Sequence, residues 1–245
     1  MQNLVIDIGN TNSKLAVFNQ KELVHYQRLE SLDEQSLASI IEKYQIVNAA
    51  VSSVNTATDK LSDFLKSKIN YILFTTAIRA GIINHYETID TLGLDRWAKV
   101  IAAHRLYPNQ NCLLIDAGTC ITYDVLTATS EYFGGSISLG INMRFAALNH
   151  YTGRLPLVQF NKDEKIIPLG SSTKNAIKNG VLQGVVNEVE GFIAAENKKN
   201  SSLKVIITGG DADFLNKQLK NSIFATQIIY DPYLVLKGLN EVITL

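Results

Sequence analysis

The stretch Leu-Val-Ile-Asp-Ile-Gly at residues 4–9 decides the fold, because it recurs as Leu-Leu-Ile-Asp-Ala-Gly at residues 113–118. Each copy is a short apolar run that ends in Asp-x-Gly, a pattern typical of a buried strand that leads into a tight turn. The offset of 109 residues is close to half of the 245-residue chain. We therefore expect two related halves that each open with the same strand and turn.

Further apolar runs follow each copy in the same order, at residues 15–18 and 23–26 and again at residues 123–126 and 133–137. These runs predict strands. The other predicted elements are strands over residues 47–51, 71–74, 204–207 and 228–229, and helices over residues 33–44, 58–68, 173–196 and 233–243 and after Gly210. Alternating strands and helices predict an α/β fold, with halves at residues 1–109 and 110–245, mixed sheets covered by helices, and a ligand cleft between the halves.

The composition predicts a cytoplasmic globular protein. The 23 basic and 23 acidic residues cancel, and no long run of one sign favours nucleic acid or a membrane surface as a partner. The first residues meet a charge at Asp7 after three apolar residues, which argues against an export signal, and no apolar run approaches the roughly 18 residues of a membrane span. Cys112 and Cys120 are too few for a disulfide framework, so we expect reduced, buried thiols.

Polar groups gather in the turn after the first strand. Residues 9–14, Gly-Asn-Thr-Asn-Ser-Lys, offer backbone N–H groups, two amides, two hydroxyls and one cation, all of which suit a phosphate. Asp7 stands at the strand end, where it would hold a divalent cation directly or through water. An Asn-rich hairpin without a ligand would use the same residue types. The recurrence of the pattern favours the phosphate site.

Two later turns extend this nucleotide site. Asp116, Gly118 and the hydroxyls of Thr119 and Thr122 would grip the other end of a polyphosphate. At residues 208–210, Thr-Gly-Gly, a buried strand ends in a diglycine against which a base or ribose would lie. A simple strand-to-helix turn would explain the diglycine equally well.

The segment Leu-Gly-Leu-Asp-Arg-Trp at residues 92–97 begins an expected amphipathic helix that runs through residue 102. Asp95 would accept a proton from a substrate hydroxyl as its oxygen attacks the γ-phosphate, and Arg96 would bind an anionic group. An acidic residue that complements the helix dipole is the alternative explanation for Asp95. The P-loop, GxGxxG, HExxH and GxSxG motifs are absent from the sequence, so the competing nucleotide, protease and hydrolase interpretations have no support.

Together these motifs resemble type III pantothenate kinase, a branch of the acetate kinase, sugar kinase, heat-shock chaperone and actin superfamily. The ordered resemblance spans nearly the whole chain and rests on Asp7-x-Gly9-Asn10-Thr11, Gly93-x-Asp95-Arg96, Asp116-x-Gly118-Thr119-x-x-Thr122-x-Asp124 and Thr208-Gly209-Gly210. Its most specific part is Asn84-x-Tyr86 followed by residues 92–97. The sequence departs from the family pattern at Ile89, Cys120 and Leu139, none of which removes a reacting group.

The resemblance implies two ribonuclease H-like halves with the ATP cleft between them, and a homodimer with the substrate site at its interface. It also implies transfer of the ATP γ-phosphate to the terminal hydroxyl of pantothenate, giving 4'-phosphopantothenate in the first step of coenzyme A biosynthesis. Mg²⁺ would accompany ATP, and a monovalent cation, K⁺ or NH₄⁺, would be required. Two alternatives stay open: another small-metabolite kinase of the same superfamily, or a nucleotide-binding regulatory protein.

The resemblance also implies roles for individual residues. Asp95 would be the general base, Asp116 would bind the monovalent cation, and Asp7 would bind the divalent cation. The residues that would contact ATP are Asp7, Ile8, Gly9, Asn10, Thr11, Asn12, Ser13, Lys14, Thr119, Thr208, Gly209 and Gly210. The residues that would contact pantothenate are Tyr86, Gly93, Leu94, Asp95, Arg96 and, across the dimer interface, Thr173.

Overall fold

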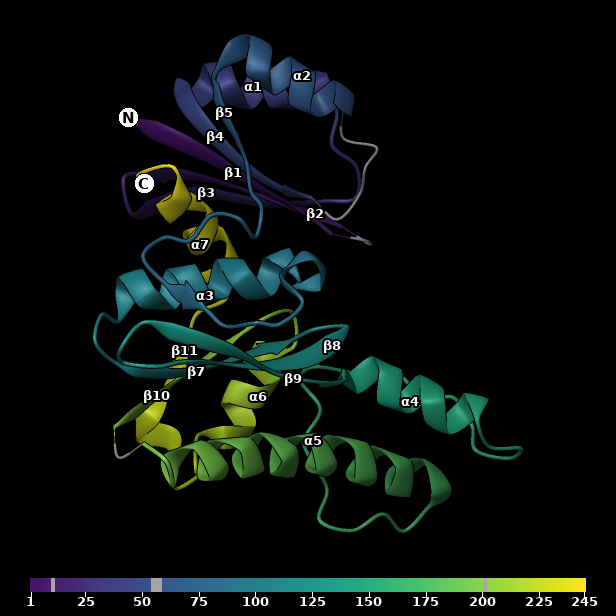
Figure 1. The fold of residues 1–245 in the computed structure, drawn as a ribbon. Coiled ribbons are helices and arrows are strands. Elements are labelled where there is room, and N and C mark those ends of the chain that lie inside the picture. Colours follow the sequence, from purple (N-terminus) through teal and green to yellow (C-terminus); the bar gives the residue numbers. More distant parts are fainter. Residues whose placement is uncertain (10–11, 54–58, 201) are drawn as a thin grey trace. The chain divides into compact units, whose positions relative to one another are not determined.

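The computed structural model describes residues 1–9, 12–53, 59–200 and 202–245, and these residues form two compact units (Figure 1). The first unit comprises Met1–Pro108, Ser130–Tyr132 and Tyr233–Leu245, and the second comprises Asn109–Thr129 and Phe133–Pro232. Each unit has a mixed sheet covered by helices, so the predicted α/β fold class is confirmed. The boundary at residue 109 stays a prediction; the last thirteen residues, expected in the second half, group with the first unit.

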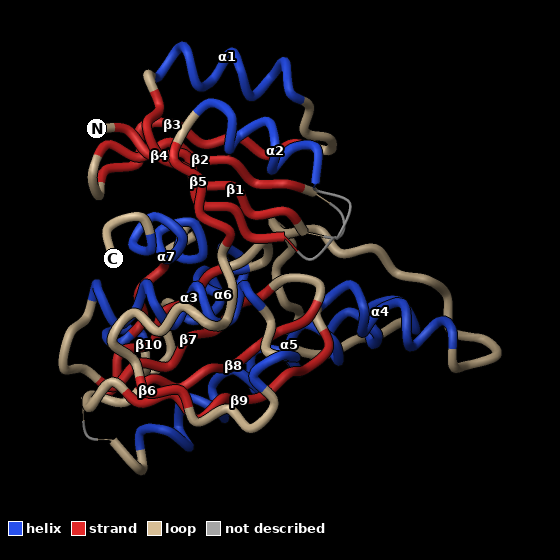
Figure 2. Tube along the Cα trace, turned by 45° about the horizontal axis from the view of Figure 1, so that its top comes forward, coloured by secondary structure: helices blue, strands red, loops and turns tan. Residues whose placement is uncertain are grey.

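The sheet of the first unit has the order β3-β2-β1-β4-β5. Its strands are β1 (Gln2–Ile8), β2 (Ser13–Asn19), β3 (Glu22–Leu29), β4 (Ile46–Ser53) and β5 (Asn70–Leu73). The central strand β1 runs antiparallel to β2 and parallel to β4. Helices α1 (Glu34–Tyr44) and α2 (Asp59–Lys68) lie over one face, where Leu37 and Leu65 complete a core with the apolar side chains of the strands (Figure 2).

Helix α7 (Leu234–Val242) covers the other face of this sheet, and α3 (Leu94–Leu106) packs on α7. A Cβ atom at Gly238 would lie 1.9 Å from the carbonyl oxygen of Ala98, so this glycine permits the close approach of the two helices. Residues Arg96–Ala103 of α3 are all buried. The prediction of an amphipathic helix is therefore wrong for this stretch, because α3 has no solvent-facing stripe there.

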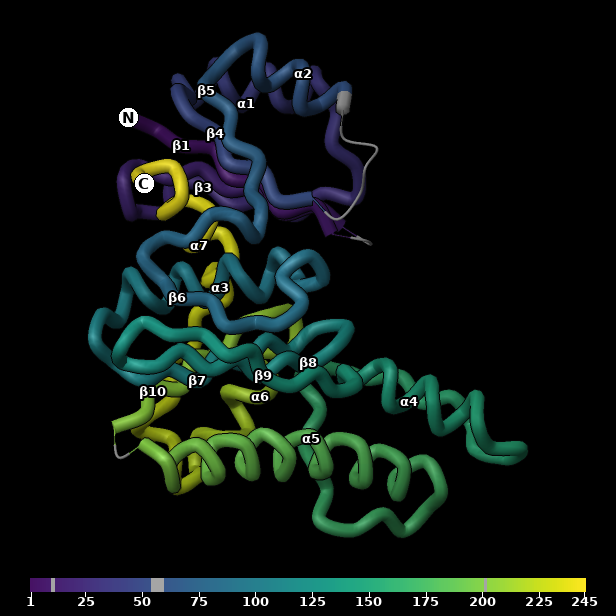
Figure 3. Tube along the Cα trace, in the orientation of Figure 1, coloured from purple at the N-terminus to yellow at the C-terminus, as the bar shows by residue number. Residues whose placement is uncertain are grey.

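A chain of side-chain amides attaches α7 to the first sheet. Asn70 Nδ2 donates to Asn48 Oδ1 (3.1 Å), Asn48 Nδ2 to Asn3 Oδ1 (3.0 Å) and Asn3 Nδ2 to Asn240 Oδ1 (2.9 Å). Asn240 Nδ2 then donates to the carbonyl oxygen of Gln20 (2.7 Å). The bonds of Asn3 and Asn240 satisfy buried polar groups that would otherwise destabilise the fold. Figure 3 shows the result, with the last helix beside the first strands.

The sheet of the second unit has the order β11-β10-β7-β8-β9, and β6 pairs with the first residues of β9. The strands are β7 (Asn111–Ala117), β8 (Cys120–Leu126), β9 (Glu131–Leu139), β10 (Leu203–Thr208) and β11 (Ile228–Tyr230), while β6 (Ile83–Asn84) belongs to the first unit. Helices α5 (Thr173–Asn197) and α6 (Ala212–Leu219) pack their apolar side chains on one face of this sheet (Figure 1). The other elements are α4 (Ile141–His150) and two short 3₁₀ helices, η2 (Ile89–Thr91) and η3 (Ala225–Gln227).

The predicted duplication is confirmed by strand order and by burial. Each sheet has a central strand between an antiparallel and a parallel neighbour: β1 between β2 and β4, and β7 between β8 and β10. Strands β1 and β7 also share one burial pattern, in which Asp7 and Asp116 are half-buried one residue before the strand end. No helix among the described residues is long and apolar enough to cross a membrane.

Candidate active site

The turn after β1 brings a carboxylate and an ammonium group together. Asp7 lies opposite Lys14 in the β1–β2 register, and Asp7 Oδ2 is 3.7 Å from Lys14 Nζ. The Gly9 N–H donates to the carbonyl oxygen of Asn12 (3.2 Å), which closes the turn. Ile8 and Ser13 are buried beside it. Two other residues expected at this turn, Asn10 and Thr11, lie outside the described residues.

The start of α3 presents a second carboxylate of the first unit. Gly93 is the N-cap residue, and a Cβ atom there would lie 2.7 Å from Asp95 Oδ1. The Asp95 side chain therefore rests against the Gly93 backbone. Asp95 is exposed, whereas Leu94 is half-buried and Arg96 is only 4% exposed. An exposed carboxylate on a rigid helix start is accessible to a substrate hydroxyl and is suited to accept its proton.

Aromatic rings hold the buried guanidinium group of Arg96. Arg96 Nη1 donates to the Tyr86 hydroxyl (3.3 Å), and Arg96 Cζ lies 5.4 Å from the centre of the Tyr86 ring. The Tyr86 N–H donates to Asn84 Oδ1 (2.9 Å), and the Tyr86 ring stacks on Tyr132 at 6.3 Å. Tyr132 in turn packs against Trp97. Such contacts fix the guanidinium plane, as recognition of a planar acceptor requires.

In the second unit, Asp116 lies level with polar residues of both neighbouring strands. It pairs in register with Thr122 of β8 and with Thr208 of β10, and both threonines are buried. The Gly118 N–H donates to the carbonyl oxygen of Cys120 (2.9 Å), which closes a turn two residues shorter than the turn after β1. A carboxylate and hydroxyls at one place provide the oxygen atoms that hard cations prefer.

The diglycine turn contacts the Asp116 turn directly. Gly209 has φ +99°, and a Cβ atom there would lie 2.3 Å from Asp116 Oδ1. The Asp211 N–H donates to the carbonyl oxygen of Ala117 (2.8 Å). By contrast, a Cβ atom at Gly210 would meet nothing within 4 Å. The space beside Gly210 is therefore open, and a ligand can approach the backbone there.

The remaining predicted residues of the second unit are exposed. Thr119 is exposed in the Asp116 turn, and Thr173 is exposed at the first position of α5, after the N-cap Ser172.

Of the two free cysteines, Cys112 is buried, which raises the pKa of its thiol to about 12. Cys120 is only half-buried, with its sulfur 4.0 Å from that of Met143. Burial of both thiols was expected, and it holds for Cys112 alone.

Within the units, the structure brings the predicted residues into three groups: the Asp7 turn, the Gly93–Arg96 segment with Tyr86, and the Asp116 turn with Gly209 and Gly210. Tyr132, which supports Tyr86, was not predicted. Its only signal in the sequence is an aromatic residue next to a predicted strand, a position that many aromatic residues share. Among the described residues, no group of three or more His, Cys, Asp or Glu side chains is arranged to hold a metal ion.

Comparison with known proteins identifies relatives of the whole chain. The family model described as type III pantothenate kinase matches residues 3–195. A type III pantothenate kinase from Bacteroides fragilis is 41% identical over 244 residues, which cover 98% of this chain and 97% of the relative.

Solved structures share the fold at lower identity. A protein from Campylobacter jejuni described as a Baf family transcriptional activator has a TM-score of 0.62 and 24% identity, covering 98% of this chain and 97% of its own. A protein from Cytophaga hutchinsonii described as a sugar kinase has a TM-score of 0.53 and 12% identity, with both chains fully covered. At these identities the similarity shows the fold alone.

Proposed function

The chain belongs to the type III pantothenate kinase family, and from that premise we propose how its residues divide the reaction between them. The protein is an ATP-dependent kinase that phosphorylates pantothenate to 4'-phosphopantothenate, the first step of coenzyme A biosynthesis. Mg²⁺ accompanies ATP in this reaction. The residue roles below, the monovalent cation, the dimer and the cytoplasmic location are proposals.

Asp95 is the proposed general base, and the observation that carries this role is its exposed carboxylate beside the buried Arg96. Arg96, oriented by Tyr86, binds an anionic group of pantothenate. Gly93 and Leu94, at the same helix start, also contact this substrate. Asp95 then accepts the proton of the terminal hydroxyl as that oxygen attacks the γ-phosphorus and ADP leaves in line. Arg96 and the first residues of α3 position pantothenate for the reaction, because phosphoryl transfer depends mainly on alignment and charge.

The phosphates of ATP are assigned to the turn from Asp7 to Lys14 and to Thr119, and the adenosine to Thr208, Gly209 and Gly210. The open space at Gly210 supports the adenosine assignment. Mg²⁺ typically binds through one or two carboxylates together with substrate phosphates, so Asp7 alone is a sufficient protein ligand. Its half-buried carboxylate at the strand end fits that role.

The monovalent cation, K⁺ or NH₄⁺, is assigned to Asp116. The carboxylate of Asp116 and the hydroxyl of Thr122 in the adjacent strand give an oxygen-rich donor set that fits such a cation. The cation would supply positive charge near the phosphates. The protein residues would only bind this cation and would take no part in the chemical step.

A homodimer is supported by the apolar outer face of β9. Phe133 and Ile137 are each 62% exposed, and Leu139 on the same face is also exposed. Large exposed apolar residues in one strand mark an interaction surface. Thr173, exposed at the start of α5, would reach the pantothenate of the partner subunit. ATP and pantothenate as substrates favour a cytoplasmic location.

The Asp95→Asn variant tests the base. Asparagine keeps the shape of the side chain but cannot take a proton, so kcat should fall by about 10²–10⁴-fold while both KM values change little. Steady-state kinetics with ATP and pantothenate would measure this. Asp90→Asn, an exposed carboxylate in η2, is the matched control and should retain full kcat. Near-normal turnover by Asp95→Asn would show that Asp95 is not the general base.

A further inference from the structure

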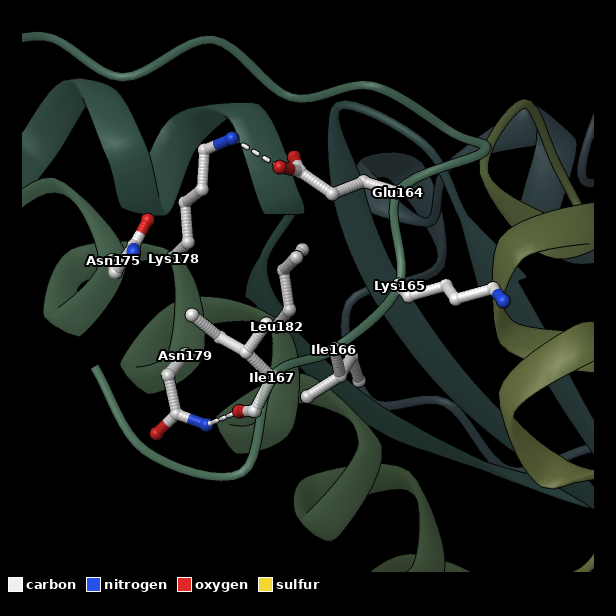
Figure 4. Close-up of a pocket in the computed structure, with 8 residues that line it drawn as sticks. All are labelled: Glu164, Lys165, Ile166, Ile167, Asn175, Lys178, Asn179 and Leu182. Carbon is white, nitrogen blue, oxygen red and sulfur yellow. Dashed lines mark hydrogen bonds and ion pairs between the residues drawn. The ribbon is translucent and has the colours of Figure 1, made fainter. Parts of the chain in front are cut away.

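The loop between α4 and α5 is attached to its surroundings by charge. Three consecutive residues of this loop form ion pairs with residues of α5 or with α6 and its N-cap: Lys162 with Asp211, Asp163 with Lys217, and Glu164 with Lys178. Figure 4 shows Glu164 directed toward Lys178 while Lys165 points away, beside a cavity of about 80 Å³ that separates the loop from α5. On either side of these three residues, Phe160 and Ile166 pack on the core of the second unit.

The pair between Lys162 and Asp211 differs from the other two in the burial of its carboxylate. Asp211 is 7% exposed, and Lys162 Nζ lies 3.5 Å from its Oδ1. Asp211 occupies the N-cap position of α6, where an aspartate normally accepts a hydrogen bond from the first helical N–H groups, yet it makes no such bond. The side chain is turned toward Lys162 instead. A buried carboxylate of this kind requires a nearby cation.

Lys162 also contacts the backbone of the diglycine turn, because its ammonium group donates to the carbonyl oxygen of Gly210. On the other side of that turn, the Asp211 N–H donates a hydrogen bond to the carbonyl oxygen of Ala117, and the Gly209 backbone lies against the Asp116 side chain. The turn is thus held between the Asp116 turn on one side and a single loop lysine on the other.

We propose that Lys162 is a positioning residue for ATP, which holds the Gly210–Asp211 backbone in the conformation that receives the adenosine. The lysine acts through the turn and does not touch the reacting atoms. This role rests on the assignment of Gly209 and Gly210 to ATP made above. It also means that the Lys162 side chain connects the nucleotide site to the α4–α5 loop, which leads directly to Thr173.

Kinetics of Lys162→Met test the proposal, because methionine keeps the length of the side chain and removes its charge. We expect the KM for ATP to rise about tenfold, the size typical of a lost hydrogen bond to a charged group, with kcat and the KM for pantothenate within about twofold. Lys162→Arg, which can donate to the same two oxygens, should restore most of the affinity for ATP.

Lys217→Met is the matched control. Lys217 pairs with Asp163 of the same loop and with Asp213 of α6, but no contact joins it to the diglycine turn among those described. Its KM for ATP should stay at the wild-type value. An equal rise in both methionine variants, an unchanged KM for ATP in Lys162→Met, or an equal rise in the KM for pantothenate would each overturn the proposal.

Gly210→Ala separates this proposal from the assignment on which it rests. The added methyl group meets no atom within 4 Å outside the two neighbouring residues, so the fold should tolerate it while the space for the nucleotide shrinks. If Gly210→Ala raises the KM for ATP and Lys162→Met does not, the adenosine site stands and the role of Lys162 is wrong. If Gly210→Ala binds ATP normally, the adenosine assignment itself fails, and the proposal with it.

Discussion

The carboxylate of Asp95 leaves no room for a side chain at Gly93, where a Cβ atom would lie 2.7 Å from Asp95 Oδ1. The backbone of Gly93 is in a conformation that alanine also adopts, so the helix start should survive Gly93→Ala. The flexible Asp95 side chain would move instead. We expect kcat to fall by about 10–100-fold through this displacement alone, with the melting temperature little changed.

Rapid-quench measurement of the phosphoryl-transfer step would test this expectation, because it separates chemistry from product release. A Gly93→Ala variant with normal single-turnover rates would show that the base does not depend on its contact with Gly93. The double variant Gly93→Ala with Asp95→Asn should be no slower than Asp95→Asn alone, since both changes act on one carboxylate.

At this scale, the sequence could nominate only residues that belong to short local motifs. Asp7, Asp95 and Asp116 could be selected because each lies two residues from a glycine that marks a turn or a helix start. Tyr132 and Lys162 could not be selected, because their partners Tyr86 and Asp211 lie far away in the chain. A contact between distant residues leaves no spacing pattern in a single sequence.

Among the elements, α6 has the buried Asp211 at its N-cap, and burial disfavours the charged form of this carboxylate. Burial raises the pKa of Asp211 above its ordinary value of 3.8, and Lys162 offsets this only in part. The folded protein therefore binds this proton more tightly than the unfolded chain does. The associated stability is fully present below the ordinary pKa and is lost as pH rises through the raised, folded-state pKa.

Asp211→Asn should consequently raise the free energy of unfolding at pH 7, by about 1 kcal/mol, the size of a helix-cap contribution, since asparagine carries no charge and also caps well. The gain should shrink as pH falls toward 4. Urea unfolding of wild type and variant across this pH range would measure both effects. A variant less stable than wild type at pH 7 would mean that the attraction of Lys162 outweighs the cost of burial.

The elements that could be predicted are those with a continuous apolar run or a clear helical stripe. Strands β1 and β7 are buried on both faces in their central parts, where residues 4–6 and 112–115 form unbroken apolar runs. Helix α4 was not predicted, because only Ile141 and Phe145 are buried and no stripe results. Strand β6 has two residues, which is too few for any periodicity.

In the whole molecule, a substrate site shared between two subunits has a testable consequence. If Asp95 of one subunit works with Thr173 of the other, two inactive variants can complement each other. We expect Asp95→Asn and Thr173→Arg to be inactive alone, but co-refolded hybrids carry one site with both native residues. About a quarter of wild-type activity should return when the variants are mixed equally, because half of the dimers are hybrids with one intact site each.

Measured turnover of the mixture, with each variant refolded alone as its control, decides the matter. Continued inactivity of a mixture shown to contain hybrids would place Asp95 and Thr173 in the same subunit's site, or Thr173 outside the site altogether.

The duplication and the fold class of the whole molecule could be predicted, because the repeat is visible in the sequence. The grouping of α7 with the first unit could not, because chain order carries no record of which sheet a terminal helix covers.

That grouping affects the order in which a ribosome can complete the molecule. Strands β1 to β5 emerge first, but the helix that covers one face of their sheet is the last element of the chain. Asn3 can meet Asn240 only after nearly every residue has been added. The second unit draws all its residues from positions 109 to 232 and has them available earlier. Translation therefore begins the first unit before the second, yet it supplies the final piece of the first unit last.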